Sequence, residues 1–271
     1  MTELSINETT TFRWSFEEDA LHYAAAGIPA IGVWRQKLSD FGRVKAVELL
    51  EECRLKVSHL FWAGGFTGSD GRRYDESVQD AFDAIEAAAE ISAPTLVVHS
   101  GGRGGHTANH ARRLMKNALH ELAPEAHKKG VTLAIEPMHP GCAAEWTFLT
   151  CLDEALALLD AVGSRHAKLV LDTYHLGHDA DLLDRIPQIV DRVALVQLGD
   201  ARHPPGNEPN RCLLGDGMVP LPEIVGALQA AGYEGYYDFE VLGEDVEALD
   251  YVSRLEHAKQ AFSDLVAVGS R

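Results

Sequence analysis

The stretch Lys168-Leu-Val-Leu-Asp-Thr-Tyr-His175 joins a short apolar run to an acidic residue and a histidine. Residues 168–171 predict a buried strand that ends directly before Asp172. A buried carboxylate needs a partner charge or a metal ion. At the carboxyl end of a strand in an α/β protein, such a partner usually belongs to a functional site. We therefore expect Asp172, and His175 three residues later, to face one pocket.

Three further strand-like segments end in a side chain that carries an oxygen donor, namely Glu136, Gln197 and Glu240. Together with Asp172 they form an oxygen-only set, which suits a hard divalent cation. We expect Mn²⁺, with Mg²⁺ and Co²⁺ as alternatives. The competing interpretation is that each residue is an ordinary polar group at a strand end.

Strand-like and helix-like segments alternate along the whole chain. The predicted strands cover residues 9–14, 30–34, 56–62, 95–99, 131–136, 168–171, 193–197 and 235–240. The predicted helices cover residues 16–26, 41–53, 76–91, 108–129, 150–161, 182–190, 221–231 and 244–266. Strands separated by helices pair in parallel, and eight of them in ~250 residues fit a closed barrel. We predict a single (β/α)8 TIM barrel domain over residues 1–271, with an open doubly wound sheet as the alternative.

The composition is that of an ordinary globular protein, with 46% hydrophobic and 24% charged residues among 271. A formal net charge of −17 argues against binding to nucleic acid or to an anionic membrane. No apolar run approaches the ~20 residues of a membrane span, and residues 1–11 do not resemble a secretory signal. The four cysteines lack CxxC spacing and form no disulfide framework. We expect a cytoplasmic protein.

Tryptophans end three predicted strands on the other half of the barrel, at Trp14, Trp34 and Trp62. Aromatic faces suit the C–H faces of a sugar, although simple core packing explains them equally well. His99 and His139 are candidates for binding substrate hydroxyls, or are structural histidines.

Two loops carry further candidate features. Asp200 either belongs to the site or anchors its loop through backbone hydrogen bonds. Residues 101–105, Gly-Gly-Arg-Gly-Gly, lack the Lys-Ser/Thr of a P-loop and the spacing of a dinucleotide fingerprint. We interpret them as a flexible wall of the site.

Five motifs in order carry a family resemblance: Ile135-Glu-Pro-Met-His139, Leu171-Asp-Thr-Tyr-His175, Val196-Gln-Leu-Gly-Asp200, Leu214-Gly-Asp-Gly217 and Tyr237-Asp-Phe-Glu240. They resemble the xylose-isomerase-like TIM-barrel family of sugar isomerases and epimerases, nearest to its hydroxypyruvate-isomerase-like and ketose 3-epimerase branches. The likeness covers nearly the whole chain, and it is specific for the superfamily and not for a substrate.

The resemblance implies roles for individual residues. Glu136, Asp172 and Glu240 match three metal ligands of the family, and Gln197 matches the fourth, as in the hydroxypyruvate-isomerase-like branch. His175 and Arg202 match positions that hold substrate oxygens. The second glutamate of the epimerases falls on Cys142 here, a departure that argues against a simple ketose 3-epimerase. Barrels of this family often pair, which implies a homodimer.

These parts predict a divalent-metal-dependent isomerase or epimerase that acts on a small carbohydrate, keto-acid or keto-sugar. A metal chelated by the carbonyl and hydroxyl oxygens of the substrate acidifies the C–H group between them and stabilises an enediolate. Glu136 and Glu240 would act as catalytic acid and base on the two faces of the substrate.

Three other functions compete with this prediction. A metal-dependent dehydratase or lyase of a keto-sugar or keto-inositol needs the same site. An apurinic endonuclease shares the barrel and the Asp172-x-x-His175 pattern, but it needs an Asp-x-His after strand seven, where this sequence has Asp216-Gly-Met218. A non-catalytic sugar-binding protein would not need four ligand positions and two acid/base groups.

Overall fold

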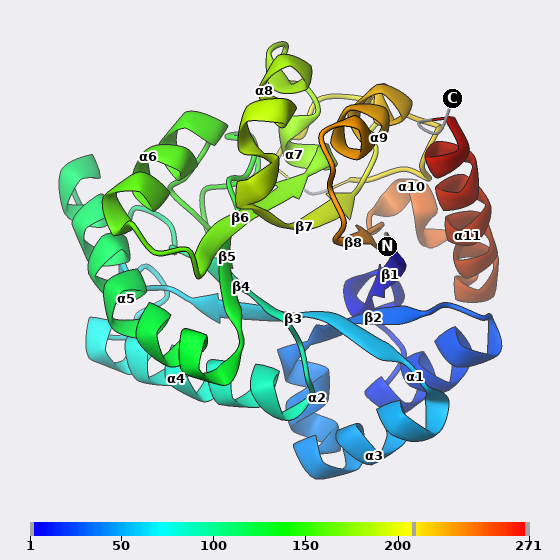
Figure 1. The fold of residues 1–271 in the computed structure, drawn as a ribbon, viewed down its shortest axis with the longest axis horizontal. Coiled ribbons are helices and arrows are strands. Elements are labelled where there is room, and N and C mark those ends of the chain that lie inside the picture. The colour runs from blue at the N-terminus through cyan, green and yellow to red at the C-terminus, as the bar shows by residue number, and fades with distance from the viewer. Residues whose placement is uncertain (1–2, 208–209, 269–271) are drawn as a thin grey trace.

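Eight parallel strands close into a barrel that a ring of helices surrounds, as the computed structural model shows (Figure 1). The structure describes residues 3–207 and 210–268. The strands pair in sequence order, and β8 closes the barrel by pairing with β1. The predicted (β/α)8 TIM barrel is confirmed, and the alternative of an open doubly wound sheet is wrong.

The strands are β1 Glu3–Asn7, β2 Ala30–Trp34, β3 Lys56–Gly64, β4 Thr95–His99, β5 Thr132–Ile135, β6 Ala167–Asp172, β7 Val193–Leu198 and β8 Tyr236–Phe239. The α-helices are α1 Phe16–Ala25, α2 Arg35–Phe41, α3 Arg43–Cys53, α4 Tyr74–Glu90, α5 Ala108–Lys129, α6 Leu152–Val162, α7 Thr173–Leu176, α8 Leu182–Ile189, α9 Leu221–Ala230, α10 Glu244–Glu247 and α11 Tyr251–Val268. Two 3-10 helices, η1 Glu8–Thr11 and η2 Val190–Arg192, complete the elements. Within the described residues, no helix has both the length and the apolar character needed to cross a membrane.

The first strand lies earlier in the chain than predicted. Residues 9–14 were expected to form it, but β1 is Glu3–Asn7, and the segment after it turns through η1. Asn7 ends the strand because its side-chain oxygen accepts a hydrogen bond from the backbone N–H of Thr9, at 3.0 Å, and so caps η1. Trp14 therefore does not end a strand.

Side-chain alternation places the candidate ligands at one end of the barrel interior. An apolar layer inside the barrel consists of Val97, Ala134, Val170 and Leu195. Because side chains alternate between the two faces of a strand, the residues two positions later point into the same interior. Those residues are His99, Glu136, Asp172 and Gln197. The register between β6 and β7 pairs Asp172 with Gln197, so these two residues lie at the same level of the barrel.

The other half of the barrel interior is polar. Asn7 donates a hydrogen bond to Asp238 at 3.0 Å, and the imidazole of His59 lies beside both. Gly32 makes room for this ring, because a Cβ there would lie 2.3 Å from its Cε1 atom. Asp238 points into the interior two residues before Glu240, so this network supports the end of β8 from which Glu240 enters the site.

A buried ion pair fixes the segment between β1 and α1. Lys37 of α2 lies 2.5 Å from Asp19 of α1 and also donates to the backbone carbonyls of Glu8 and Thr11. Burial raises the pKa of Asp19 to about 6, and Lys37 opposes this shift. The side chain of Glu8 accepts a hydrogen bond from the backbone N–H of Trp34 at 2.6 Å. This cluster therefore ties η1 to the end of β2.

Replacing Lys37 by Met tests the weight of this cluster. Removal of one partner from a buried ion pair leaves an uncompensated charge, so Lys37→Met should lower the free energy of unfolding by about 3–5 kcal/mol. The loss should be larger at pH 8 than at pH 5. Without Lys37 the buried Asp19 carboxyl group stays protonated in the folded protein, and keeping that proton costs more free energy as the pH rises. Urea denaturation at the two pH values measures this. The control is Lys56→Met, which breaks the exposed Lys56–Glu3 pair and should leave the transition unchanged.

Candidate active site

The end of β6 positions two of the candidate residues. Asp172 accepts a hydrogen bond from the backbone N–H of Tyr174 at 2.7 Å and thereby caps the short helix α7. His175 follows three residues later, about one helical turn, so its ring comes back beside Asp172. The distance from His175 Nε2 to Asp172 Oδ2 is 3.8 Å. The two side chains therefore lie side by side, and of the two only His175 is among the residues that line the cavity described below.

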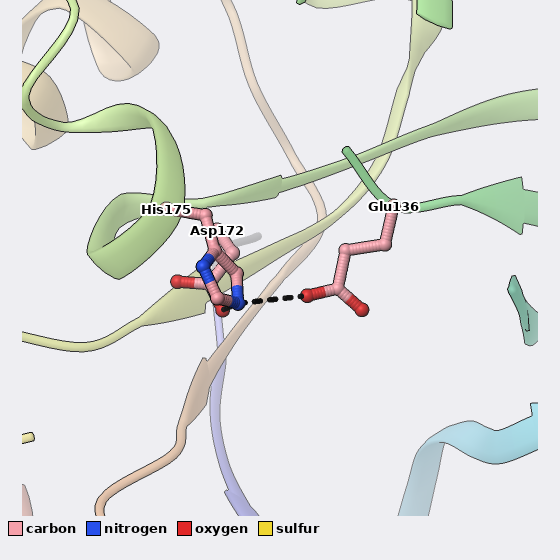
Figure 2. Close-up of side chains that lie close together, drawn as sticks. All are labelled: Glu136, Asp172 and His175. Atoms are coloured by element: carbon pink, nitrogen blue, oxygen red, sulfur yellow. Dashed lines mark ion pairs between the residues drawn. The ribbon is translucent and has the colours of Figure 1, made fainter. Parts of the chain in front are cut away.

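Glu136, Asp172 and His175 form a buried cluster of possible metal ligands. Figure 2 shows the three side chains converging, with Glu136 entering from the end of β5. His175 Nε2 lies 3.6 Å from Glu136 Oε1, and one ligand atom from each of the three residues lies within 4.8 Å of the others. His175 Nε2 is buried without a hydrogen-bond partner. The sequence predicts that this histidine binds substrate, and the structure places it beside the candidate ligands.

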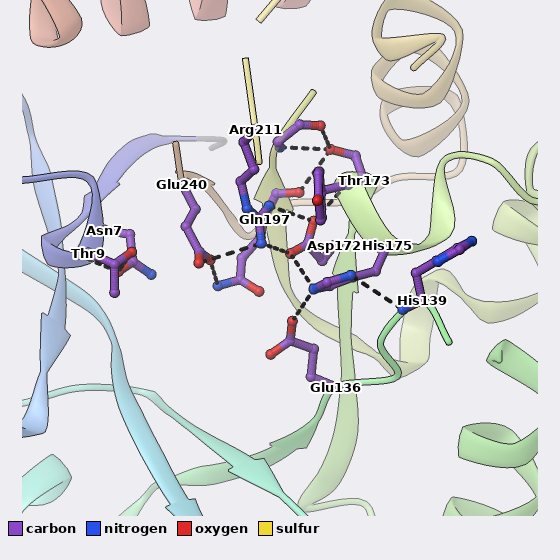
Figure 3. Close-up of polar contacts among 12 residues, drawn as sticks. Asn7, Thr9, Glu136, His139, Asp172, Thr173, His175, Gln197, Arg211 and Glu240 are labelled. Atoms are coloured by element: carbon purple, nitrogen blue, oxygen red, sulfur yellow. Dashed lines mark hydrogen bonds and ion pairs between the residues drawn. The ribbon is translucent and has the colours of Figure 1, made fainter. Parts of the chain in front are cut away.

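Gln197 and Glu240 lie next to this cluster (Figure 3). Gln197 Nε2 donates to Glu240 Oε2 at 2.6 Å. The other Gln197 atom, Oε1, is buried without a partner, although a buried amide oxygen is ordinarily hydrogen-bonded. The unsatisfied oxygen of Gln197, among three buried carboxyl groups, is what a divalent cation would satisfy. The residues present therefore fit such an ion.

Arg211 is the functional residue that sequence reasoning missed. Its guanidinium binds both oxygens of Asp172, at 3.2 and 2.8 Å, and lies 3.5 Å from Glu240 Oε1. It stacks on the ring of Tyr174 at 4.4 Å. Gly199 leaves room for it, because a Cβ at that position would lie 2.2 Å from its Nη1 atom. In the sequence, the glycine two residues after Gln197 could have indicated that a large side chain packs there, but it does not identify that side chain.

Burial and neighbouring charges give the acidic groups of the site different pKa values. The pKa of Glu240 is raised to about 8, first by burial and then by the nearby carboxyl groups of Asp172 and Glu136, while Arg211 opposes the shift. Burial also acts to raise the pKa of Asp172, but Arg211, His175 and the backbone N–H of Tyr174 together outweigh it and hold that pKa below its usual value. Burial lowers the pKa of His175 to about 4. At neutral pH the protein groups alone thus provide a protonated Glu240, an ionised Asp172 and a neutral His175.

A cavity of about 540 Å³ opens onto this cluster at the carboxyl ends of the strands. The size suits a small ligand. Among the residues predicted to contact substrate, His99, His175, Trp34 and Trp62 line it, and so does the predicted catalytic residue Glu240. Glu136 lies directly behind this lining, because its Oε2 atom is 2.8 Å from His99 Nε2.

Trp14, Arg202 and His139 were predicted to contact substrate but do not line this cavity. Trp14 stacks on His22 with ring centroids 4.3 Å apart, over a separate surface depression. The side chain of Arg202 is 52% exposed and faces acidic residues of the rim. The His139 side chain accepts a hydrogen bond from its own loop, although its backbone N–H donates to His175 Nδ1 at 3.3 Å. Their predicted contacts stay predictions.

Asp200 anchors its loop. One carboxylate oxygen accepts from the backbone N–H groups of Ala201 and Val219, and the other from those of Gly215 and Gly217, all between 2.8 and 3.1 Å. The structural alternative for this residue is confirmed. The anchored loop brings Arg211 back toward Asp172.

Cys142 occupies the cavity wall beside His175. Its Sγ atom lies 3.6 Å from His175 Nδ1, and burial raises the pKa of the thiol to about 11. Gly101 of the glycine-rich loop donates a backbone hydrogen bond to the carbonyl of Trp146 at 2.9 Å. Residues 101–105 are not among the residues that line the cavity, so their predicted place in its wall stays a prediction.

Comparisons with known proteins agree with this architecture. A family model described as xylose isomerase-like TIM barrel matches residues 21–262. A D-psicose 3-epimerase of Enterocloster bolteae is 32% identical over 124 residues, which span 45% of this chain and only 37% of the epimerase. A provisionally named hydroxypyruvate isomerase of Streptomyces coelicolor is 26% identical over 254 residues, covering 84% of this chain and 86% of that protein. The IOLI protein, solved with a bound zinc atom, has the same fold, with a TM-score of 0.85, 19% identity and 98% of each chain covered.

The two arginines offer a paired test of the geometry. Arg211→Met should lower the free energy of unfolding at pH 7 by about 3–5 kcal/mol, because it leaves the buried Asp172 carboxylate unpaired. The pKa of Asp172 is depressed in the folded protein, so the contribution of the pair is present at neutral pH and is lost as the pH falls through that pKa. The free energies of unfolding of the wild-type protein and of Arg211→Met should therefore converge toward acid pH. Denaturant melts at several pH values measure this, and equal effects of Arg211→Met and the exposed Arg202→Met would contradict it.

Proposed function

The chain belongs to the xylose isomerase-like TIM barrel family, and on this premise we propose that it is a divalent-metal-dependent isomerase or epimerase of a small α-hydroxycarbonyl compound such as a sugar or keto-acid. The observation that carries the proposal is the pair of buried carboxyl groups, Glu136 and Glu240, at one end of the barrel beside unsatisfied donor atoms. The names of the relatives, which include 3-epimerases and a hydroxypyruvate isomerase, support the same reaction class.

The proposed metal ligands are Glu136, Asp172, Gln197 and Glu240. A divalent ion bound there would polarise the carbonyl and hydroxyl oxygens of the substrate and so acidify the C–H group between them. We propose Mn²⁺ as the resident ion.

The protein groups would move the proton. Glu136 and Glu240 enter the site from β5 and from the end of β8, so they can reach a bound substrate from different sides. One carboxylate takes the proton from carbon, and the other carboxyl group returns one.

His175 and Arg211 would hold the substrate oxygens. His175 is neutral at pH 7, so it can donate one hydrogen bond without adding charge. Arg211 lines the cavity, whereas the side chain of Arg202 is half exposed at the rim. We therefore propose Arg211 as the guanidinium that contacts substrate. Return of the proton to the neighbouring carbon gives isomerisation, and return to the opposite face of the same carbon gives epimerisation.

Deuterium exchange tests this proposal. Mn²⁺-loaded protein is incubated in D₂O with hydroxypyruvate, D-psicose, L-ribulose and related ketoses, and the products are analysed by NMR. Deuterium should enter at the carbon between carbonyl and hydroxyl, together with an interconverted product. Glu136→Gln and Glu240→Gln should each reduce the rate at least about 100-fold. The exposed Glu125→Gln is the control. A Glu240→Gln protein with full turnover would falsify the acid/base assignment, and an unsaturated product would identify a dehydratase instead.

Metal binding should release a proton. Ligation needs an ionised Glu240, which is mostly protonated at pH 7 because its pKa is about 8. The Kd for Mn²⁺ should therefore tighten as the pH rises from 6 to 8, by up to about tenfold per pH unit. Calorimetry in buffers of different ionisation enthalpy counts the released protons.

Two variants serve as controls for this titration. Asp172→Asn should abolish Mn²⁺ binding. Glu240→Gln should bind more weakly, with the proton release gone. Proton release that is unchanged in Glu240→Gln would assign the titrating group elsewhere.

A further inference from the structure

The cavity above the candidate metal cluster is chemically divided. Its floor is polar and consists of His99, His175, Arg211 and Glu240. Its upper wall is mainly apolar and aromatic, formed largely by Phe12, Trp34, Phe61, Trp62, Trp146 and Leu242. A ligand that places its reacting carbons on the floor must place its remaining atoms against this wall.

The aromatic wall is continuous with the floor. The ring of Trp62 stacks on the His99 ring with centroids 5.6 Å apart, and Trp146 meets both rings edge-on at 5.5 and 5.9 Å. Phe12 and Trp146 remain 44% and 41% exposed at the mouth. Large aromatic side chains left open at the entrance of a cavity favour apolar ligand surface.

Polar partners for distal hydroxyl groups are few. Away from the floor, the polar side chains among the described residues that line the cavity are Thr9, Glu145 and Asn207, besides the thiol of Cys142. Thr9 already donates its hydroxyl hydrogen to Asn7 Oδ1 at 2.8 Å. A hydroxyl group placed against the wall would lose its hydrogen bonds to water and gain few in return, which costs binding free energy.

A phosphate group fits this cavity poorly. Among its described lining residues, Arg211 is the single lysine or arginine, and it is held by Asp172 and Glu240. Glu145 adds negative charge to the wall, and the chain carries a formal charge of −17. A dianion would therefore enter an acidic surrounding with no free cation to pair with it.

We infer that the substrate is an uncharged α-hydroxycarbonyl compound whose end remote from the reacting carbons is deoxygenated, carrying a methyl, alkyl or aryl group. The inference rests on the proposed function for the polar end and specifies the other end of the same substrate. A sugar phosphate is excluded by the same argument, and a fully hydroxylated sugar is a poorer substrate than its deoxy counterpart.

Three matched compounds test this inference: a ketohexose, its 6-deoxy analogue and its 6-phosphate. Binding is followed by tryptophan fluorescence, because three of the four tryptophans line the cavity. Turnover is followed by deuterium exchange. The 6-deoxy compound should exceed the ketohexose by about tenfold in both affinity and kcat/KM. The 6-phosphate should be at least about 100-fold weaker than the ketohexose.

Two tryptophan variants locate the effect. Trp146→Ala should reduce the preference for the 6-deoxy compound to about twofold or less. Trp14→Ala, which removes an aromatic ring outside the cavity, should keep both the preference and the fluorescence response.

The outcomes separate this inference from the proposed reaction. Exchange that favours the ketohexose or the phosphate would overturn the inference and leave the reaction standing. Tight binding of the 6-deoxy compound without exchange would support the ligand class and overturn the reaction. Neither binding nor exchange with any of the three compounds would overturn both.

Discussion

The electrostatic constraint on this barrel is the confinement of three carboxyl groups, Glu136, Asp172 and Glu240, in one buried end. The guanidinium of Arg211 contacts two of them and holds Asp172 ionised, while Glu240 keeps its proton at neutral pH because of burial and of its acidic neighbours. The one guanidinium balances a single carboxylate, so a third ionised carboxyl group would be left unpaired. A divalent cation bound there would allow Glu240 to ionise and would satisfy the free oxygen of Gln197.

The barrel geometry explains why much of the site could be predicted from the sequence. In a closed parallel barrel, residues at the ends of neighbouring strands lie at the same level, so an acidic or amide residue directly after an apolar strand is already located in space. Glu136, Asp172, Gln197 and Glu240 were found in this way, and the hydrogen bond between Gln197 and Glu240 shows that two of them meet. Strand boundaries from β2 to β8 agreed within about two residues for the same reason.

Predictions failed where long-range contacts decide the local structure. Residues 9–14 contain threonine and aromatic residues that favour strands, but the hydroxyl groups of Thr10 and Thr11 bond to Phe239 and Asp19 in distant elements, and the segment turns. Arg211 lies in a loop whose path depends on Asp200 and on a backbone hydrogen bond to Leu242. Local sequence patterns contain neither contact. Arg202 matches a family motif but lies at the rim, because the spacing of residues in a loop does not determine where a side chain points.

The strand ends and the loops of this molecule have different roles, one in the chemistry and the other in specificity. Strand ends, held by the barrel ladder, carry the groups that would move a proton, whereas the loops bring Phe12 and Trp146 to the mouth. Next to the floor, burial keeps the Cys142 thiol protonated and His175 neutral at pH 7. In the proposed reaction, the changes of charge would then fall on Glu136 and Glu240. Substitutions in the apolar loops could then change which remote end of the substrate is accepted without disturbing the carboxyl groups at the floor.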